Sequence, residues 1–148
     1  MYQRILIATD GSELADKAVA HGIALAKDLA VPICVVTVTG PWSAFELAQM
    51  SRMGDRNPIG RYEEMAAAAA NSILGKAGEL AKAQGVRFEL VHVQDRRPSE
   101  GIIAAAKDKA CDLIVMASHG YRGLNRLLLG SQAYEVLTHS KVPALVVR

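Results

Sequence analysis

Two short segments combine the residue types that hold phosphate groups and sugar hydroxyls. The first is Asp10-Gly11-Ser12, which directly follows a short apolar run. The second runs from Ser118 to Gly123 and leads on to a glycine-serine pair at Gly130-Ser131. Glycines allow a ligand to approach the backbone closely, and free N–H groups at the start of a helix attract anions. We therefore expect the second segment to hold a phosphate chain, and Asp10 to accept ribose hydroxyls or to hold a divalent cation such as Mg²⁺.

The second segment also contains a possible nucleophile and base. Ser118 and His119 are adjacent, and with Asp10 they would make the three members of a small hydrolase site. Adjacent residues rarely reach each other in hydrogen-bond geometry, so we interpret the pair as loop structure. Efficient phosphoryl transfer also needs a cation clamp, metal ligands and a positioned nucleophile, for which only Asp10 and Arg122 or Arg126 are available. We expect no rapid turnover and leave slow hydrolysis open.

Ordinary structural roles could explain the same residues. Asp10-Gly11 is a common turn pair, Ser12 suits the cap of a helix, and the glycines of the second segment suit turns. The four histidines are scattered without the spacing of metal ligands, which argues against a zinc site. The chain contains neither GxGxxG after its first apolar run nor GxxxxGKS/T, so a classical dinucleotide fold and a P-loop ATPase are not indicated.

Alternating strands and helices must position these segments. The pattern βαβαβαβαβ predicts a single-domain α/β protein over residues 1–148, with an open five-stranded parallel sheet and helices on both faces. Ligands of such sheets bind outside the carboxyl ends of the strands, where strand order reverses. The third strand alternates in polarity and should lie at an edge. We expect strands over residues 4–9, 31–38, 86–93, 112–117 and 144–147, and helices over 12–30, 62–84, 98–110 and 131–139.

Composition narrows the possible partners. The 148 residues carry a net charge of +2 and are 51% hydrophobic, which supports a folded core. The pI near 8.6 and the lack of a basic block argue against nucleic acid, and the apolar runs are too short to cross a membrane. Cys34 and Cys111 each lie in an apolar run without CxxC spacing, so we expect buried thiols in the reducing cytoplasm rather than a disulfide or a metal site.

Several stretches resemble the universal stress proteins, over essentially the whole chain. They are the opening ILIATDGS, the stretch MASHG at Met116 to Gly120, LLLGS at Leu127 to Ser131, and the closing VPALVVR. Nucleotide-binding members of that family carry a Gly-x2-Gly-x9-Gly-Ser/Thr motif. Here nine residues separate Gly120 from Gly130-Ser131, and Ala117 stands in place of the first glycine.

The resemblance implies a Rossmann-like fold of the adenine nucleotide alpha-hydrolase type. It also implies a cytoplasmic stress-response protein that binds ATP or AMP, with Mg²⁺ as a possible companion, and acts as a regulatory or sensor module on an unknown protein partner. The last strand would pair across a homodimer. By resemblance, Asp10 and Val38 would contact ribose and adenine. The full set of implied nucleotide contacts is Ala8, Thr9, Asp10, Val38, Met116, Ala117, Ser118, His119, Gly120, Arg122, Gly123, Gly130, Ser131 and Gln132.

Ala117 leaves an alternative open, because the family divides into members that bind ATP and members that lack the motif and do not. The alternative is a dimeric interaction module that binds no nucleotide. The methyl group of Ala117 would be tolerated if the backbone there adopts ordinary β angles.

Residues 40–61 form a long segment of mixed character beside the expected pocket. The segment carries Trp42, Phe45 and two methionines, side chains that suit a surface that closes over a ligand. We hypothesise that Ala44 to Met50 forms a short helix that covers the base and ribose when nucleotide is bound. A disordered loop, or a helical turn packed permanently on a neighbour, would explain the segment equally well.

Overall fold

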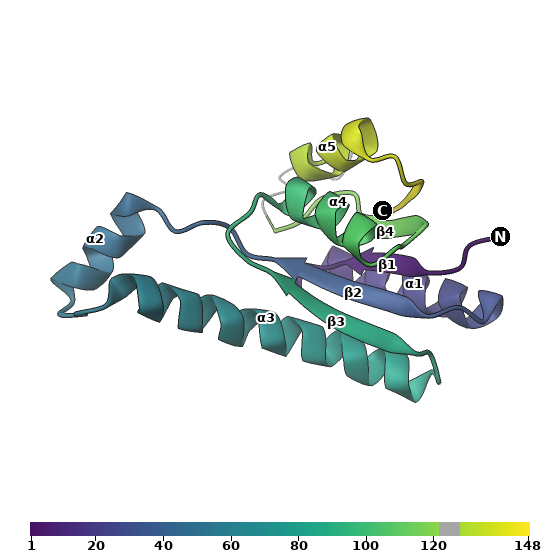
Figure 1. Cartoon of the computed structure of the whole chain (residues 1–148), viewed down its shortest axis with the longest axis horizontal. Helices are drawn as coiled ribbons and strands as arrows, with labels where there is room; N and C mark the ends of the chain where they lie inside the picture. The colour runs from purple at the N-terminus through teal and green to yellow at the C-terminus, as the bar shows by residue number, and fades with distance from the viewer. Residues whose placement is uncertain (122–127) are drawn as a thin grey trace.

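Five parallel strands form one sheet in the order β3-β2-β1-β4-β5, with helices on both sides (Figure 1). The computed structural model describes residues 1–121 and 128–148. In chain order the elements are β1 (Ile5–Ala8), α1 (Glu13–Leu29), β2 (Ile33–Val38), α2 (Ala44–Arg52), α3 (Pro58–Ala83), β3 (Phe88–Val93), α4 (Pro98–Asp108), β4 (Leu113–Ala117), α5 (Ser131–His139) and β5 (Ala144–Val147). The predicted α/β class and five-stranded parallel sheet are confirmed.

The sheet is central because its inner strands are apolar on both faces. Alternate residues of β1 enter two separate cores: Ile5 and Ile7 pack against α1 and α3, whereas Leu6 and Ala8 pack against α4 and α5. Such continuous apolar runs are typical of strands covered by helices on both faces. Both cores hold the sheet rigidly, so the loops that leave its strands start from fixed positions.

The edges of the sheet are β3 and β5. The expected edge position of β3 is confirmed, but the exposure of its two faces differs from the alternation in polarity. Phe88 and Leu90 remain more than one third exposed, whereas Glu89 on the other face is less exposed. Strand order reverses between β1 and β4, since β1 leads through α1 to β2 on one side, while β4 lies on the other. The carboxyl ends of β1 and β4 therefore mark the place where ligands bind in sheets of this type.

Residues 40–61 contain more helix than the sequence predicts. The second long helix begins at Pro58 rather than at Tyr62, with Asn57 accepting a hydrogen bond from the Gly60 N–H at 3.2 Å. Proline is favoured at the first helical position, and here it opens the helix instead of interrupting it. The short helix expected over 44–50 is present and extends to Arg52. A capping box between Ser43 and Glu46 stabilises its start.

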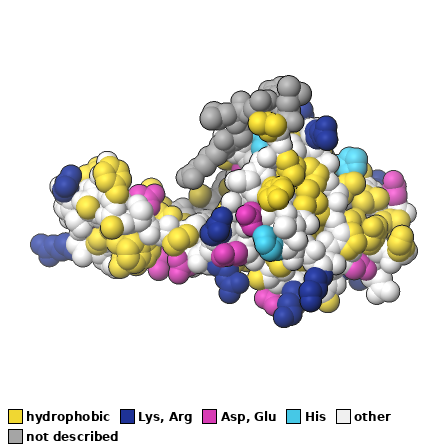
Figure 2. Space-filling model, turned by 90° about the horizontal axis from the view of Figure 1, so that it is seen from above, with side chains coloured by type: hydrophobic (Ala, Val, Ile, Leu, Met, Phe, Trp, Pro, Cys, Tyr) yellow, Lys and Arg dark blue, Asp and Glu magenta, His cyan; other side chains and the backbone are white. Residues whose placement is uncertain are grey.

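α2 and the first part of α3 form an arm (residues 44–69) that stands away from the sheet (Figures 1 and 2). α2 has no buried residue, and the element it packs against is α3. Hydrophobic side chains lie exposed on the arm, including Phe45 and Met53.

Among the described helices, none is long and apolar enough to span a membrane.

Candidate functional site

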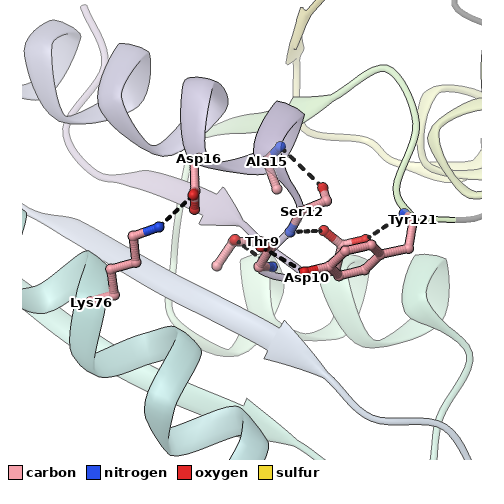
Figure 3. Close-up of polar contacts among 8 residues, drawn as sticks. Thr9, Asp10, Ser12, Ala15, Asp16, Lys76 and Tyr121 are labelled. Carbon is pink, nitrogen blue, oxygen red and sulfur yellow. Dashed lines mark hydrogen bonds and ion pairs between the residues drawn. The ribbon is translucent and has the colours of Figure 1, made fainter.

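The loop after β1 is a tightly bonded turn that leads into α1. Asp10 Oδ1 accepts a hydrogen bond from the Ser12 N–H at 2.9 Å, and Thr9 Oγ1 accepts one from the Gly11 N–H at 3.1 Å (Figure 3). Gly11 has a φ of 80°, which glycine adopts without strain. Ser12 Oγ accepts from the Ala15 N–H at 3.2 Å, so the structural role of Ser12 as a helix cap is confirmed.

The loop after β4 is joined to this turn through Tyr121. The Tyr121 backbone N–H donates to Asp10 Oδ2 at 3.2 Å, and its hydroxyl donates to the Gly11 carbonyl at 2.9 Å (Figure 3). At Gly120, a Cβ would overlap the same Asp10 carboxylate oxygen. The two predicted segments therefore meet at the strand-order reversal. A carboxylate has about four acceptor positions, so Asp10 retains capacity for ligand hydroxyls.

Tyr121 is a member of the site that sequence reasoning missed. Its position directly after the predicted Gly120 could have identified it. An aromatic side chain, however, is not a usual ligand of phosphate or ribose. The residue is 73% exposed. It therefore stands in solvent at the junction of the two loops, where a ligand could contact it.

Gly130 closes the second loop and starts α5. Its N–H donates to the Ser118 carbonyl at 2.7 Å, and a Cβ on Gly130 would lie 3.0 Å from that carbonyl oxygen and 3.1 Å from His119 Cα. Because its φ is −63°, the need for glycine here is steric rather than conformational. The sequence suggested two roles for this glycine, the approach of phosphate and a turn, and the close contacts of the loop support the structural one.

The start of α5 can bind an anion. No side chain among the described residues caps this helix, and its first turn contains no acidic residue. Ser131 is exposed at this end of the helix. Uncapped N–H groups carry the positive end of the helix dipole, so this terminus attracts phosphate or carboxylate groups.

Ser118 and His119 do reach each other, so our expectation that adjacent residues would not was wrong. Ser118 Oγ lies 3.2 Å from His119 Nδ1, in a loop where the Ser118 side chain is turned inward and buried. Asp10 does not complete a triad, because its hydrogen bonds among the described residues go to the Ser12 and Tyr121 N–H groups and not to His119. The pair thus lacks a carboxylate that orients the imidazole, within the described parts of the chain.

Other predicted residues lie at the site but offer backbone rather than side chain. Ala8, Thr9 and Met116 are buried at the ends of their strands. Val38 packs against α4, where a Cβ on Gly101 would come within 2.6 Å of Val38 Cγ2. These residues can contact a ligand mainly through their N–H and C=O groups.

Gln132 points away from the loops, since its Oε1 accepts a hydrogen bond from the Ser99 N–H at 3.0 Å. It therefore ties α5 to the start of α4. Ala117 ends β4 in register with Val147 and is absent from the residues with positive φ, so its methyl group fits an ordinary strand. Arg122 and Gly123 lie outside the described residues.

Comparison with known proteins supports what this geometry suggests. The family model described as "Universal stress protein family" matches residues 1–148. The chain belongs to the universal stress protein family. It is 28% identical to universal stress protein MJ0531 of Methanocaldococcus jannaschii over the whole chain and 83% of that protein. It is 29% identical to universal stress protein YxiE of Bacillus subtilis, with full coverage of both.

Solved structures of universal stress proteins share the fold. The structure of MJ0577 superposes with a TM-score of 0.80 at 28% identity, covering 99% of this chain and 96% of that one. A universal stress protein solved in complex with cAMP superposes with a TM-score of 0.73 at 25% identity, covering 99% and 97%. The resemblance seen in the sequence motifs is thus confirmed at the level of family and fold.

Proposed function

We propose that this chain binds an adenine nucleotide, ATP or AMP, across the two loops that meet at Asp10. The bound nucleotide would bias a conformation or a partner surface of a dimeric, cytoplasmic stress-response protein, rather than feed a fast reaction. The observation that carries the proposal is the start of α5, which has no side-chain cap among the described residues. It lies at the same end of the sheet as Asp10. An anion-binding terminus and a ribose-binding carboxylate at one strand-order reversal suit a nucleotide.

The parts of a nucleotide can be assigned to the described residues. Phosphates would accept hydrogen bonds from the N–H groups of Ser131 and Gln132, since the Gly130 N–H already donates to the Ser118 carbonyl. The loop from Ser118 to Gly120 would line the sugar. Asp10 would accept the ribose hydroxyls with its remaining acceptor capacity. The backbone of Val38 would contact the base, since its side chain packs against α4. A related protein of this fold was solved with cAMP, another adenine nucleotide.

The proposal does not depend on a bound Mg²⁺ ion or on hydrolysis of the nucleotide. The described residues contain no group of three His, Cys, Asp or Glu side chains that could hold a metal ion. A Mg²⁺ ion would thus depend on Asp10 and on phosphate oxygens, as Mg²⁺ often does. Among the described residues, no carboxylate orients the imidazole of the Ser118–His119 pair, which favours binding over rapid turnover.

Calorimetric titration of ligand-stripped protein with ATP and with AMP tests the proposal. We expect saturable binding of at least one nucleotide by the wild type and its loss in Gly130→Val, whose side chain would press on the Ser118 carbonyl and on His119 and so displace the loop that would line the ligand. Gly75→Ala serves as the control, because a Cβ there meets no atom within 4 Å. If wild-type protein binds neither nucleotide, the interaction module without nucleotide is the better description.

A further inference from the structure

An open pocket of about 190 Å³ lies between α4 and α5. The two helices pack against each other on the same face of the sheet (Figure 1). Both helices and the residue before α4 line the pocket, with side chains of both charge signs: Arg97, Ser99, Glu100, Ile103, Glu135 and His139. None of these residues belongs to the loops that meet at Asp10, so the pocket is separate from the proposed nucleotide site.

Ser99 is the buried polar residue of this pocket. It lines the pocket although only 4% of its surface is exposed. Its N–H donates to Gln132 Oε1 at 3.0 Å, but its hydroxyl forms no hydrogen bond with any described residue. The hydroxyl oxygen is not fully enclosed by protein atoms, so it opens onto the pocket. Buried polar groups are normally hydrogen-bonded, and here the partner must be a molecule in the pocket.

The start of α4 provides a binding position for a carboxylate. The first N–H groups of a helix have no partner within the helix and carry the positive end of its dipole. Because Pro98 has no N–H and the Ser99 N–H is bonded to Gln132, the Glu100 N–H is left for a ligand. The Arg97 side chain does not cap the helix and forms no ion pair with any described residue. Its guanidinium is therefore available to the same carboxylate.

Two carboxylates line the pocket together with these donors. Glu100 lies in the first turn of α4 and forms no ion pair with any described residue. Glu135 of α5 is held by His139, whose Nδ1 lies 3.2 Å from Glu135 Oε2. A ligand that carries only a negative charge would be repelled by the carboxylates, and one that carries only a positive charge would be repelled by Arg97. The lining therefore favours a molecule that carries both charges.

The volume and the remaining wall narrow the class of ligand. A water molecule occupies about 30 Å³ in the liquid, so the pocket has the volume of about six waters, which is too small for a nucleotide. Ile103 supplies an apolar part of the wall. We propose that this pocket binds a free α-amino acid with a short apolar side chain.

Each group of the amino acid has a partner in the pocket. The α-carboxylate accepts hydrogen bonds from the Ser99 hydroxyl, the Glu100 N–H and the Arg97 guanidinium. The α-ammonium group donates to the carboxylates of Glu100 and Glu135, and the side chain packs on Ile103. Binding at this pocket requires no nucleotide, so it is tested on nucleotide-free protein.

Two-dimensional NMR of the isotope-labelled full-length chain tests the proposal, with L-alanine, L-valine and L-leucine as probes. We expect saturable shifts of the Ser99 and Glu100 amide signals with at least one probe, and unchanged signals at Asp10. The probe that binds most tightly is then compared with the amine that lacks its carboxylate and with the carboxylic acid that lacks its amino group. Each analogue should bind at least about tenfold more weakly, because it loses hydrogen bonds to a charged group.

Variants test the assigned contacts. Ser99→Ala, Arg97→Gln and Glu100→Gln should each weaken amino-acid binding about tenfold. Ser72→Ala and Glu13→Gln are the matched controls, since Ser72 is exposed on α3 and Glu13 is an exposed acid in the first turn of α1. Both controls should keep wild-type affinity, and circular dichroism verifies that each variant is folded.

Three outcomes would overturn the proposal. The first is that none of the three amino acids shifts the Ser99 and Glu100 signals at millimolar concentration. The second is that the amine or the carboxylic acid binds as tightly as the amino acid, which would make this a site for a single charge. The third is wild-type affinity in folded Ser99→Ala, which would show that the buried hydroxyl does not contact the ligand.

Discussion

Asp10 is the residue that joins the two loops, because its carboxylate accepts backbone N–H groups from both. One oxygen holds the turn that starts α1, and the other holds Tyr121 from the loop after β4. This double role makes Asp10 a structural residue as well as a candidate ligand. Substitution of Asp10 itself would therefore not separate the two roles, and neighbouring glycines give sharper tests.

Gly120→Ala should reduce nucleotide affinity. Its Cβ would overlap Asp10 Oδ2, so the loop must move and the hydrogen bond from the Tyr121 N–H must lengthen. We expect at least about a tenfold loss of ATP affinity by calorimetry, or 1.4 kcal/mol. Gly75→Ala should keep wild-type affinity and gain about 0.5–1 kcal/mol in free energy of unfolding. Equal ATP affinity in both variants would show that the junction at Asp10 does not take part in nucleotide binding.

Ala117→Gly tests the departure from the family motif. Ala117 lies in an ordinary strand position beside Val147, so its methyl group should not obstruct a ligand. We expect ATP affinity within about twofold of wild type, a change of less than 0.5 kcal/mol. Thermal or urea unfolding should show a loss of about 0.5–1 kcal/mol from glycine in a strand. A tenfold tighter complex would instead show that the methyl group blocks the site.

The sequence predicted which residues meet, but not how they are oriented. The strand-order rule brought Asp10 beside the loop after β4, and this follows from the alternation of strands and helices alone. The direction of Gln132 toward Ser99, the contact of Ser118 with His119 and the bridge through Tyr121 depend on side-chain rotamers and on loop path. Residue types and spacing do not determine either of these.

The arm makes the fewest packing contacts with the sheet, since α2 has no buried residue. A shallow cavity of about 60 Å³ lies where it joins the sheet, lined by Thr39, Trp42 and Tyr62 among others. Tyr62 donates a hydrogen bond to the Gly40 carbonyl at 3.2 Å, which holds this junction together. α2 packs on α3 and stands away from the sheet (Figure 1), so it does not cover the loops that meet at Asp10 in the structure as described.

Closure of the arm over a bound base would change the surroundings of Trp42. We expect the fluorescence of this lone tryptophan to shift on saturation with ATP, and hydrogen exchange over residues 40–61 to slow. Trp42→Phe should abolish the fluorescence signal and keep the exchange difference. Identical exchange and fluorescence with and without nucleotide would mean that α2 is simply packed on α3.

The β3 edge is held by an ion pair that depends on pH. Hydrogen bonds from Lys109 and Arg4 lower the pKa of Glu89. A carboxylate with a lowered pKa stabilises the folded state above its unfolded pKa of about 4.3, and this stabilisation is lost as the pH falls through the folded value. The side chain is 40% exposed, so solvent screening keeps the effect small.

Glu89→Gln should therefore lower the free energy of unfolding at neutral pH, and the difference from wild type should shrink as the pH falls below about 4. Urea unfolding at a series of pH values measures this difference. Glu64→Gln is the matched control, since Glu64 is exposed on α3 and forms no ion pair with any described residue. A difference that stays constant with pH would show that Glu89 contributes by packing alone.

Element boundaries were predicted well where burial determines them. Strand and helix ends in the core agree within a few residues, because a doubly buried strand must be apolar throughout. The prediction was weakest in the arm, where no core contact selects the apolar face. There the capping box at Ser43 marks the start of α2, and the proline at position 58 marks the start of α3.

The outer edge of β5 is an open strand edge at which another strand could pair. The Pro143 carbonyl accepts a hydrogen bond from the Ile114 N–H of β4, and the Val147 carbonyl accepts one from the Ser118 N–H just after β4. Because backbone groups alternate in direction along a strand, the N–H groups of Ala144 and Val146 point to the open edge. An apolar edge with free donors favours association. A two-fold dimer in which β5 pairs antiparallel with its symmetry mate would satisfy these groups on both subunits.

Val146→Pro should convert this dimer to monomer. The substitution removes one edge donor without breaking the hydrogen bonds between β5 and β4. Light scattering at micromolar concentration should show a dimer for wild type and for Val146→Ala, which keeps the N–H group, and a monomer for Val146→Pro. A dimeric Val146→Pro variant would place the interface elsewhere, and a monomeric wild type would contradict the dimer.

The central position of β1 has a consequence for how the protein is made. β2 follows β1 closely in the chain and can complete one of its edges early, whereas the other edge waits for β4, where Ile5 pairs with Leu113. A nascent chain on the ribosome therefore carries an open, apolar β1 edge until most of the sequence has emerged. Such an edge invites pairing with other chains, so newly made protein should rely on chaperones more than the finished fold does.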